Sequence, residues 1–442
     1  MGLRDFLVTP IYFLLFSLIA FVLKPIFTTK ATAKYFLPAL WVKFIGAISL
    51  GVIYQFYYGG GDTLNYFTHG SRWIWEAFLD DTNYGIELLL DSGGFREPGP
   101  TFKYSSRIWY FRDPHSYAIV RIAAFFDLFT FHTYTATALF FAVFSFSGLW
   151  AFFSAVSKKY GDSKWIALAI LFVPSTVFWG SGILKDTITL GALGWLTWCM
   201  ISLIDLREKK VIYFLVAFLA AYLIYSIKVY ILLCYLPTIS VWLYWKNQLR
   251  VKNFIVKVIV APILISFFCL LGYFILQQIS SVSGSYSIDS IAKKAAVTAN
   301  DIRYGWGARA GGEGGYDLGV LDGSWQSMIS LLPQAINVSL FRPYLWEVKT
   351  PLMLLTAIES LIMLILTIKL VFSYRRKLIF NDSFLVFCFV FSLLFAFAVG
   401  VSTYNFGTLM RYKIPMIPFY GILIAVGQMR RSNFDVENNQ ID

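Results

Sequence analysis

Continuous apolar runs, each about 20 residues long, recur along this chain and constrain its fold more than any other feature. With 58% hydrophobic residues and a mean hydropathy of +0.65, the chain has too much apolar surface for one soluble core. In a bilayer only helices and closed barrels satisfy every backbone polar group, and barrel strands would alternate polar and apolar residues over short segments. The sequence therefore predicts an all-α fold, a polytopic transmembrane helical bundle, with residues 1–442 forming a single integral membrane domain.

The apolar runs predict about 11 spans, and the first is expected to be retained because no small-residue cleavage pattern follows it. The predicted spans are Pro10–Phe27, Pro38–Tyr57, Thr133–Val156, Trp165–Ile183, Thr187–Asp205, Val211–Ile227, Val229–Trp245, Phe254–Leu276, Pro351–Phe372, Ser383–Ser402 and Tyr412–Gly427.

Short basic segments separate the spans and fall on alternate sides of them. They are Thr28–Lys34, Ser157–Lys164, Arg207–Lys210, Lys246–Lys252, Tyr374–Lys377 and Arg430–Arg431. The positive-inside rule places such segments in the cytoplasm, and so predicts an N-terminus outside and a C-terminus in the cytoplasm. Topology also accounts for the net charge of +12, so we expect membrane lipids rather than nucleic acid as partners.

Two long loops then share the outer face, residues 58–132 and residues 277–350. In the first loop, helical spacing of apolar residues over 72–81 and 117–131 predicts two interfacial helices. The second loop predicts a helix over 288–302 and an amphipathic stretch over 325–340, separated by a Gly-rich segment, 303–315. That segment is either a lid over a substrate or a plain linker.

Several common chemistries lack their signatures. His69, His115 and His132 do not have the spacing of metal ligands, and no nucleophile-elbow, Walker or dinucleotide-binding pattern stands in a suitable context. Cys199, Cys234, Cys269 and Cys388 all lie within apolar runs, so we interpret them as small core residues without a disulfide. Hydrolase and ATPase functions lose most of their support.

The strongest catalytic candidate is Asp62, which follows three consecutive glycines at the outer end of the second predicted span. Glycines let backbone amides approach a bound group closely. Asp62 is expected to act as a general base toward an acceptor hydroxyl, or to hold a divalent cation such as Mg²⁺ or Mn²⁺. The structural alternative is a helix-terminating turn, or an N-cap for the following segment, because Asp is a preferred capping residue.

Cations at the outer ends of spans form the second part of the candidate site, because outer cations oppose the positive-inside bias. Arginine and lysine bind phosphate oxygens, so these residues predict a substrate that carries phosphate. The predicted phosphate contacts are Lys185, Lys228, Arg342 and Arg411, and Asp186, Glu347, Tyr66 and His69 are predicted to support them. For Lys228 the simpler alternative is a side chain that snorkels to lipid headgroups. The predicted role of Tyr66 is to stack on a sugar ring, and the alternative is that it belongs to the ordinary belt of aromatic residues at the membrane interface.

Four short motifs resemble a known family. They are the outer-loop Asp62, the segment from Pro174 to Asp186 that ends in Ser-Gly-Ile-Leu-Lys-Asp, the Arg-Pro-x-x-Trp-Glu motif at 342–347, and the Arg-Tyr-x-x-Pro-x-x-Pro motif at 411–418. With about a dozen spans, they look like the polytopic glycosyltransferases of the GT-C type, which use polyprenyl-phosphate or polyprenyl-diphosphate sugar donors, and are similar to bacterial polysaccharide polymerase-like membrane proteins.

The resemblance implies that Asp62 is the catalytic base or metal contact and that Lys185, Arg342 and Arg411 hold donor phosphates. The family's acidic residue commonly follows its first span, whereas Asp62 follows the second here, which an extra N-terminal helix explains. No soluble domain is expected after the last span, which favours a glycan, lipid or small acceptor and leaves a protein acceptor open.

The sequence therefore predicts a glycosyltransferase at the outer face of the cytoplasmic (inner) membrane, acting on a lipid-linked sugar donor. A transporter or flippase for a lipid-linked or anionic solute is the alternative, and it would place ionisable residues near the bilayer midplane in broken helices. A third possibility is a noncatalytic scaffold, in which Asp62 would be replaceable.

Overall fold

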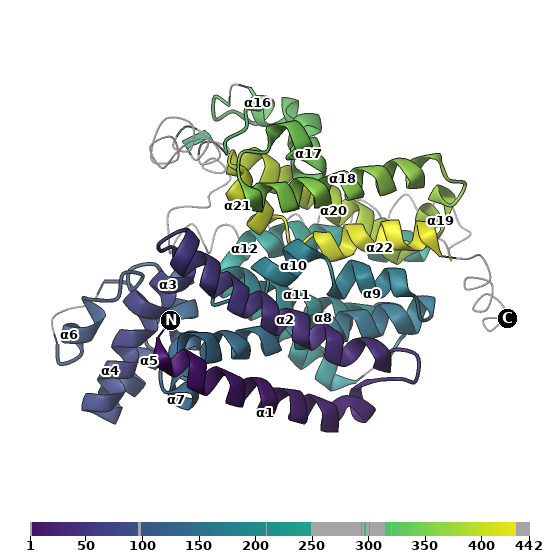
Figure 1. Ribbon diagram of the computed structural model, residues 1–442. Helices are drawn as coiled ribbons and strands as arrows, with labels where there is room; N and C mark the ends of the chain where they lie inside the picture. Colours follow the sequence, from purple (N-terminus) through teal and green to yellow (C-terminus); the bar gives the residue numbers. More distant parts are fainter. Residues whose placement is uncertain are drawn as a thin grey trace. The chain divides into compact units, whose positions relative to one another are not determined.

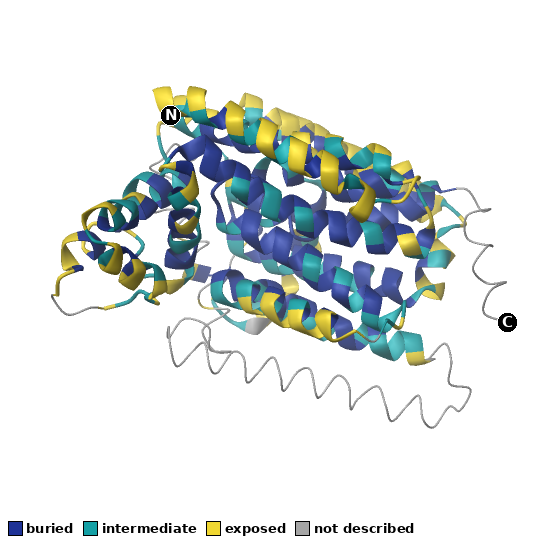
Figure 2. Ribbon diagram, turned by 90° about the horizontal axis from the view of Figure 1, so that it is seen from below, coloured by how far each residue is buried: buried dark blue, intermediate teal, exposed yellow. Residues whose placement is uncertain are grey.

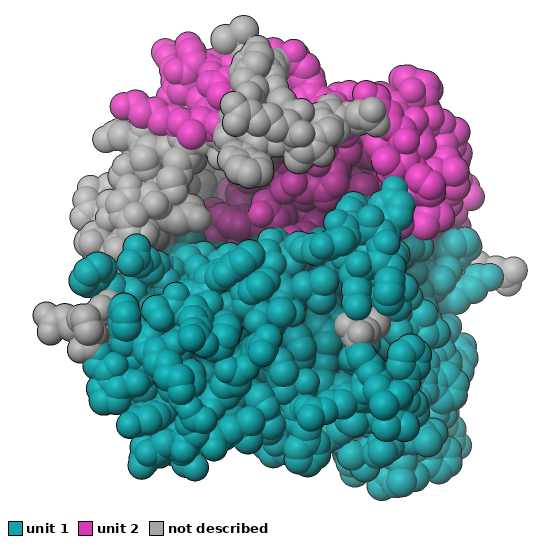
Figure 3. Space-filling view, turned by 60° about the vertical axis from the view of Figure 1, so that its left-hand side comes forward, with its two compact units in different colours: residues 1–229, 432–442 teal, residues 230–431 magenta. Residues whose placement is uncertain are grey.

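In the computed structural model, every regular element in the part of the chain that it describes is a helix, and one isolated antiparallel bridge joins Gly315 and Asn405 (Figure 1). The structure describes residues 2–95, 99–208, 210–248, 314–319 and 321–429, together with residues 293, 296, 297 and 300. The chain divides into two compact units, which Figure 3 colours separately. Unit 1 is Met1–Val229 with Ser432–Asp442, and unit 2 is Tyr230–Arg431.

Within the described residues, 7 helices are long and apolar enough to cross a membrane, or up to 8 if one bent pair forms a broken span. The bent pair is α21 (Phe406–Tyr412) and α22 (Ile417–Gln428), which meet at 73°. The others are α1 (Leu3–Phe27), α2 (Ala33–Val52) with its extension η1 (Ile53–Tyr57), α8 (Tyr134–Tyr160), α11 (Lys185–Ile204), α12 (Val211–Gln248), α18 (Pro351–Phe372) and α20 (Ser383–Thr403). These helices fit a multi-pass membrane protein.

The predicted spans over 165–183 and 211–245 differ from the observed helices, and one predicted span is not described. The span predicted over 165–183 is two short helices, α9 (Lys164–Leu171) and α10 (Pro174–Trp179), because proline disfavours helical backbone at the residue before it. The spans predicted over 211–227 and 229–245 join in α12, which is interrupted by non-helical backbone at Lys228 (φ −144°, ψ 74°). The span predicted over Phe254–Leu276 lies outside the described residues.

Unit 1 is built around the contact between α8 and α11. A Cβ on Gly148 would lie 1.9 Å from the carbonyl oxygen of Gly191, and one on Gly194 would lie 2.4 Å from that of Gly148. Only glycine allows backbones to approach this closely, and such small-residue contacts are how helices associate in lipid. In α8 and in α11, 72% of the residues in the most apolar stretch are buried, whereas in α1 the share is 11%. Figure 2 shows that α1 is largely exposed.

Three of the predicted cytoplasmic segments meet at one end of unit 1, which we call the basic end. Its ion pairs link Lys34 to Asp162 across 3.1 Å, Lys158 to Glu208, and Lys159 to Asp205. These pairs connect the loops that follow α1, α8 and α11, so the segments that the positive-inside rule groups together also lie together in the fold.

The first long loop folds into short helices at the opposite end of unit 1. They are α3 (Asp62–Tyr66), η2 (Phe67–Ser71), α4 (Arg72–Asp80), α5 (Thr82–Leu90), α6 (Phe102–Ser105) and α7 (Pro114–Thr130). Helices α4 and α7 cover the two stretches whose spacing predicts helices. The hydroxyl oxygens of Thr63 and Tyr134 lie 2.7 Å apart and join α3 to the first residue of α8.

Unit 2 packs its helices around α20. The preceding helices are α16 (Trp325–Ser330) and α17 (Leu332–Phe341), which together cover the amphipathic stretch predicted over 325–340. Close approach recurs here, because a Cβ on Gly400 would lie 2.2 Å from the carbonyl oxygen of Ala335. The unit is completed by η3 (Leu345–Glu347) and α19 (Arg376–Asn381). The helix predicted over 288–302 and the Gly-rich segment fall almost wholly outside the described residues.

Cysteine accessibility would test which side each end of unit 1 faces. In a background without the four native cysteines, we expect a membrane-impermeant maleimide to label Ser92→Cys, in the exposed loop after α5, in intact cells. Lys30→Cys, at the basic end, should react only after permeabilisation because basic loops stay in the cytoplasm. The reverse pattern of labelling would contradict the predicted orientation.

Candidate active site

Asp62 is the first residue of α3 and follows a turn made by Gly59, Gly60 and Gly61, whose φ angles are +68°, +153° and +125°. These values favour glycine, and a Cβ on Gly61 would lie 2.6 Å from the ring of Tyr54. The amide of Gly60 donates to the carbonyl of Tyr54 across 2.9 Å, so the turn packs directly on that residue. Of the two structural alternatives for this stretch, the helix-terminating turn is observed, whereas the N-cap position of α3 is taken by Gly61 rather than Asp62.

Tyr54 also connects Asp62 to the segment that carries Lys185. Its ring meets that of Trp179 edge-on, with centroids 6.3 Å apart. Trp179 ends α10, and the turn Gly180–Leu184 leads into Lys185, the first residue of α11. The Asp62 turn and the Lys185 turn therefore lie at the same end of unit 1, away from the basic end.

Lys185 faces a carboxylate from α7. Its ammonium lies 3.5 Å from Asp113, which caps α7 by accepting from the amide of His115. Partial burial opposes ionisation of Asp113, but the Lys185 charge and the hydrogen bond from Ser116 outweigh it and lower the pKa of that carboxyl below 3.8. The side chain of Asp113 is 47% exposed and that of Lys185 is 17% exposed, so the pair lies partly open to solvent.

Asp186 and Lys228 form a sealed ion pair instead. Their side chains are 0% and 6% exposed, and the ammonium of Lys228 donates to the Asp186 carboxylate. Lys228 stands at the interruption in α12, where the backbone turns away from helical geometry. The snorkelling alternative for Lys228 is therefore wrong, because its charge is directed into unit 1 rather than toward lipid headgroups.

Lys43 is a charged residue that the sequence interpretation missed. It lies on α2 with 1% exposure, and donates to the carbonyls of Thr176 and Gly180, across 3.0 and 2.8 Å, and to the hydroxyl of Ser145 across 3.2 Å. These bonds hold the end of α10 and the start of the turn before Lys185. A lysine inside an apolar run was the available signal, because such residues are rare in spans unless they have a role.

Tyr66 and His69 pack within the first loop. The ring of Tyr66 lies 4.8 Å from that of Tyr110, and His69 stacks on Trp109 with centroids 3.8 Å apart. Tyr66 is 3% exposed, so its ring is occupied by this packing and is not presented to a sugar.

Unit 2 holds the remaining predicted residues. Arg342 forms an ion pair with Glu347, and its guanidinium lies over the rings of Tyr316 and Phe406 at 5.8 and 5.3 Å. Glu347 also accepts from the amide of Tyr344 across 2.8 Å. Partial burial opposes ionisation of Glu347, but the Arg342 charge and these hydrogen bonds lower the pKa of its carboxyl below 4.5.

Arg411 and a second missed lysine lie in the bent pair of unit 2. Arg411 is 9% exposed on α21, and Lys413 is 1% exposed at the bend between α21 and α22. The ammonium of Lys413 lies 3.4 Å from the hydroxyl of Ser360, which in turn donates to the carbonyl of Arg342. The bend is thereby connected to the residue that carries the Arg342–Glu347 pair.

Removing one partner of the sealed pair should destabilise the protein strongly. We expect Asp186→Asn or Lys228→Met to cost about 3–5 kcal/mol, because each leaves a buried polar or charged group without its partner. The double variant should recover much of this loss, since two neutral groups need no ion pair. Thermal unfolding of purified protein in detergent measures the effect. Additive losses in the double variant would contradict the coupling.

The Arg342–Glu347 pair predicts a pH dependence. Because the pKa of Glu347 in the folded protein lies below 4.5, the pair contributes stability above that pH and loses it as pH falls through the lowered value. We expect Glu347→Gln to cost about 1–3 kcal/mol at pH 7 and little at the lowest pH the protein tolerates. Glu76→Gln, which breaks an exposed pair with Arg72, is the matched control and should change stability little at either pH.

The geometry thus gives unit 1 a carboxylate that follows a glycine turn and a partly exposed Lys185–Asp113 pair at one end, and gives unit 2 a shielded arginine pair. No group of three or more His, Cys, Asp or Glu side chains that could hold a metal ion occurs among the described residues. The chain matches no protein-family model, no curated protein and no solved structure.

Proposed function

We propose that this protein is a membrane glycosyltransferase that moves a sugar or oligosaccharide from a polyprenyl-phosphate or polyprenyl-diphosphate carrier to an acceptor at the outer face of the cytoplasmic membrane. The observation that carries the proposal is the placement of Asp62 and Lys185 at one end of unit 1, opposite the ion-paired loops of the basic end. Membrane-embedded chemistry on a phosphate-linked donor needs this combination of a proton acceptor and a cation.

In the proposed reaction, Asp62 accepts the proton of the acceptor hydroxyl. The hydroxyl oxygen forms a bond to the anomeric carbon of the sugar, while the bond from that carbon to the phosphate oxygen breaks. The departing phosphate keeps the bonding electrons, and Lys185 contacts its negative charge. Asp113, which is 47% exposed, yields part of its interaction with Lys185 when the phosphate arrives.

The other cations that were predicted to contact phosphate are buried or already paired. Lys228 is fully engaged by Asp186, so its role in the proposal is to hold the start of α11 and thereby Lys185. Arg342 and Arg411 belong to unit 2, where Arg342 pairs with Glu347 and Arg411 is 9% exposed, so the proposal assigns the phosphate contact to Lys185. Asp62 is also the residue that would hold a divalent cation in this proposal, and the acceptor is a glycan, a lipid or a protein.

A transporter of a lipid-linked or anionic solute is the second candidate, and two observations favour it. Lys43 and Lys413 are each 1% exposed, and each lies beside a broken helix, the α9–α10 pair in unit 1 and the α21–α22 pair in unit 2. Ionisable residues at broken helices are typical of transporter binding sites. Transport and transfer differ in whether a covalent bond of the donor is cleaved.

Replacing Asp62 tests the proposed chemistry. We expect Asp62→Asn to lower kcat by about 10²–10⁴-fold, the usual loss when a general base is removed, in liposomes supplied with a polyprenyl-diphosphate-linked sugar. The matched control is Asp80→Asn, a carboxylate of the same loop that pairs with Lys103 on the exposed surface and should leave kcat within about twofold. Equal turnover of the two variants would contradict the role of Asp62.

The same liposomes separate the two candidate functions. If the unmodified protein carries intact donor across the bilayer without releasing the sugar, the transporter candidate replaces the transferase.

A further inference from the structure

An apolar cavity of about 520 Å³ lies in unit 1, in the half that is nearer the basic end. Helices α1, α2, α8 and α11 contribute its walls, which include Phe16, Leu23, Phe36, Trp150, Trp195 and Trp198. Its volume lies within the range of pockets that hold small organic ligands. The cavity is separate from the end of unit 1 that carries Asp62.

Two of the three indole N–H groups in these walls donate hydrogen bonds within unit 1. The indole N–H of Trp150 donates to the carbonyl of Phe27 across 3.0 Å, and that of Trp195 donates to the hydroxyl of Ser147 across 3.2 Å. The cavity therefore presents hydrocarbon and aromatic surface to an occupant. In a bilayer, a cavity of this kind accommodates a lipid chain better than water.

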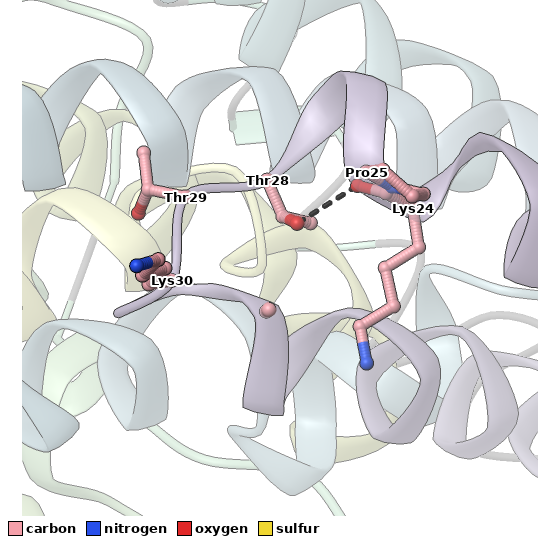
Figure 4. Close-up of a pocket in the computed structure, with 6 residues that line it drawn as sticks. Lys24, Pro25, Thr28, Thr29 and Lys30 are labelled. Carbon is pink, nitrogen blue, oxygen red and sulfur yellow. Dashed lines mark hydrogen bonds between the residues drawn. The ribbon is translucent and has the colours of Figure 1, made fainter.

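A polar pocket of about 310 Å³ adjoins the same stretch of α1 (Figure 4). Leu23, Ile26 and Phe27 line the apolar cavity, whereas Lys24 and Thr28 line the polar pocket. Lys30 in the following loop also lines the pocket. Figure 4 shows the Thr28 hydroxyl bonded to the carbonyl of Lys24, across 2.8 Å, with the two lysine ammonium groups on different sides of this bond.

Lys24 and Lys30 differ from the other lysines at the basic end in that they form no ion pair with a carboxylate in the described part of the chain. Lys34, Lys158 and Lys159 each form an ion pair with a carboxylate. Within the described ranges, neither Lys24 nor Lys30 has a carboxylate oxygen within 4.0 Å of its ammonium. The polar pocket therefore carries positive charge that an anion from outside the chain would neutralise.

We propose that unit 1 binds an anionic phospholipid here, with one acyl chain in the apolar cavity and the headgroup phosphate between Lys24 and Lys30. A free phosphate would use only the lysines, and a neutral lipid only the cavity, whereas one anionic phospholipid satisfies both. Basic residues near a membrane surface attract anionic lipid, and the basic end is where such residues gather. This site is independent of the proposed transferase reaction.

Tryptophan quenching tests the proposal, because three tryptophans line the cavity. The full-length protein, purified in detergent, is titrated with phosphatidylglycerol or phosphatidylcholine carrying brominated acyl chains. We expect saturable quenching that is selective for phosphatidylglycerol. The double variant Lys24→Gln/Lys30→Gln should weaken its apparent affinity on the order of tenfold. Lys34→Gln, which removes a lysine that is already paired, should not.

A second variant tests where the acyl chain of the lipid binds. In Trp195→Phe/Trp198→Phe the part of the quenching that is selective for phosphatidylglycerol should fall, while thermal unfolding stays close to that of the unmodified protein. Equal quenching by both lipids would overturn the proposal, as would selectivity that survives the loss of both pocket lysines. Selective quenching that is unchanged without Trp195 and Trp198 would place the lipid elsewhere and would also overturn it.

Discussion

The close contact between α8 and α11 is the constraint on which the rest of unit 1 depends. Lipid offers no hydrophobic driving force between helices, so two spans gain most from approaching until their backbones touch. Gly148 and Gly191 allow this, and the carbonyl of one helix fills the space that a Cβ would need in the other. Because α11 begins with Lys185 and Asp186, fixing this helix against α8 also fixes the depth and direction of both charges.

Charge inside the apolar interior is handled in two ways. Asp186 and Lys228 neutralise each other, whereas the ammonium of Lys43 donates hydrogen bonds to two backbone carbonyls and a hydroxyl. Both arrangements cost desolvation energy that is recovered only when the hydrogen-bonding geometry is satisfied, so both restrict how the surrounding segments can move. In each case the restricted segment leads to Lys185. The segments on both sides of the Lys185–Asp113 pair are therefore held in place, which suits the phosphate contact that we propose for Lys185.

Part of the candidate site could be predicted from sequence. The three glycines before Asp62 identified a turn, and the structure gives all three positive φ angles. Lys185 was identified because a cation on the side that the charge pattern predicts to be the outer one opposes the usual charge bias. The partners of these residues could not be predicted, because Asp113 lies 72 residues from Lys185 and Asp186 lies 42 residues from Lys228. No local pattern encodes contacts over such separations, and Lys43 was overlooked because a single lysine changes the hydropathy of a span very little.

The sequence by itself determined that the chain is helical and multi-pass, because the apolar runs leave no other way to satisfy the backbone in lipid. The sequence also contains Pro174, which separates α9 from α10, and the glycines before Asp62, because the effect of these residues on the backbone is local. The tertiary structure decided which charges neutralise one another. It also joined two predicted spans in α12 with an interruption at Lys228, whose side chain pairs with Asp186. Those outcomes depend on packing between segments far apart in the chain, where the energy of a buried charge is set by its neighbours in space.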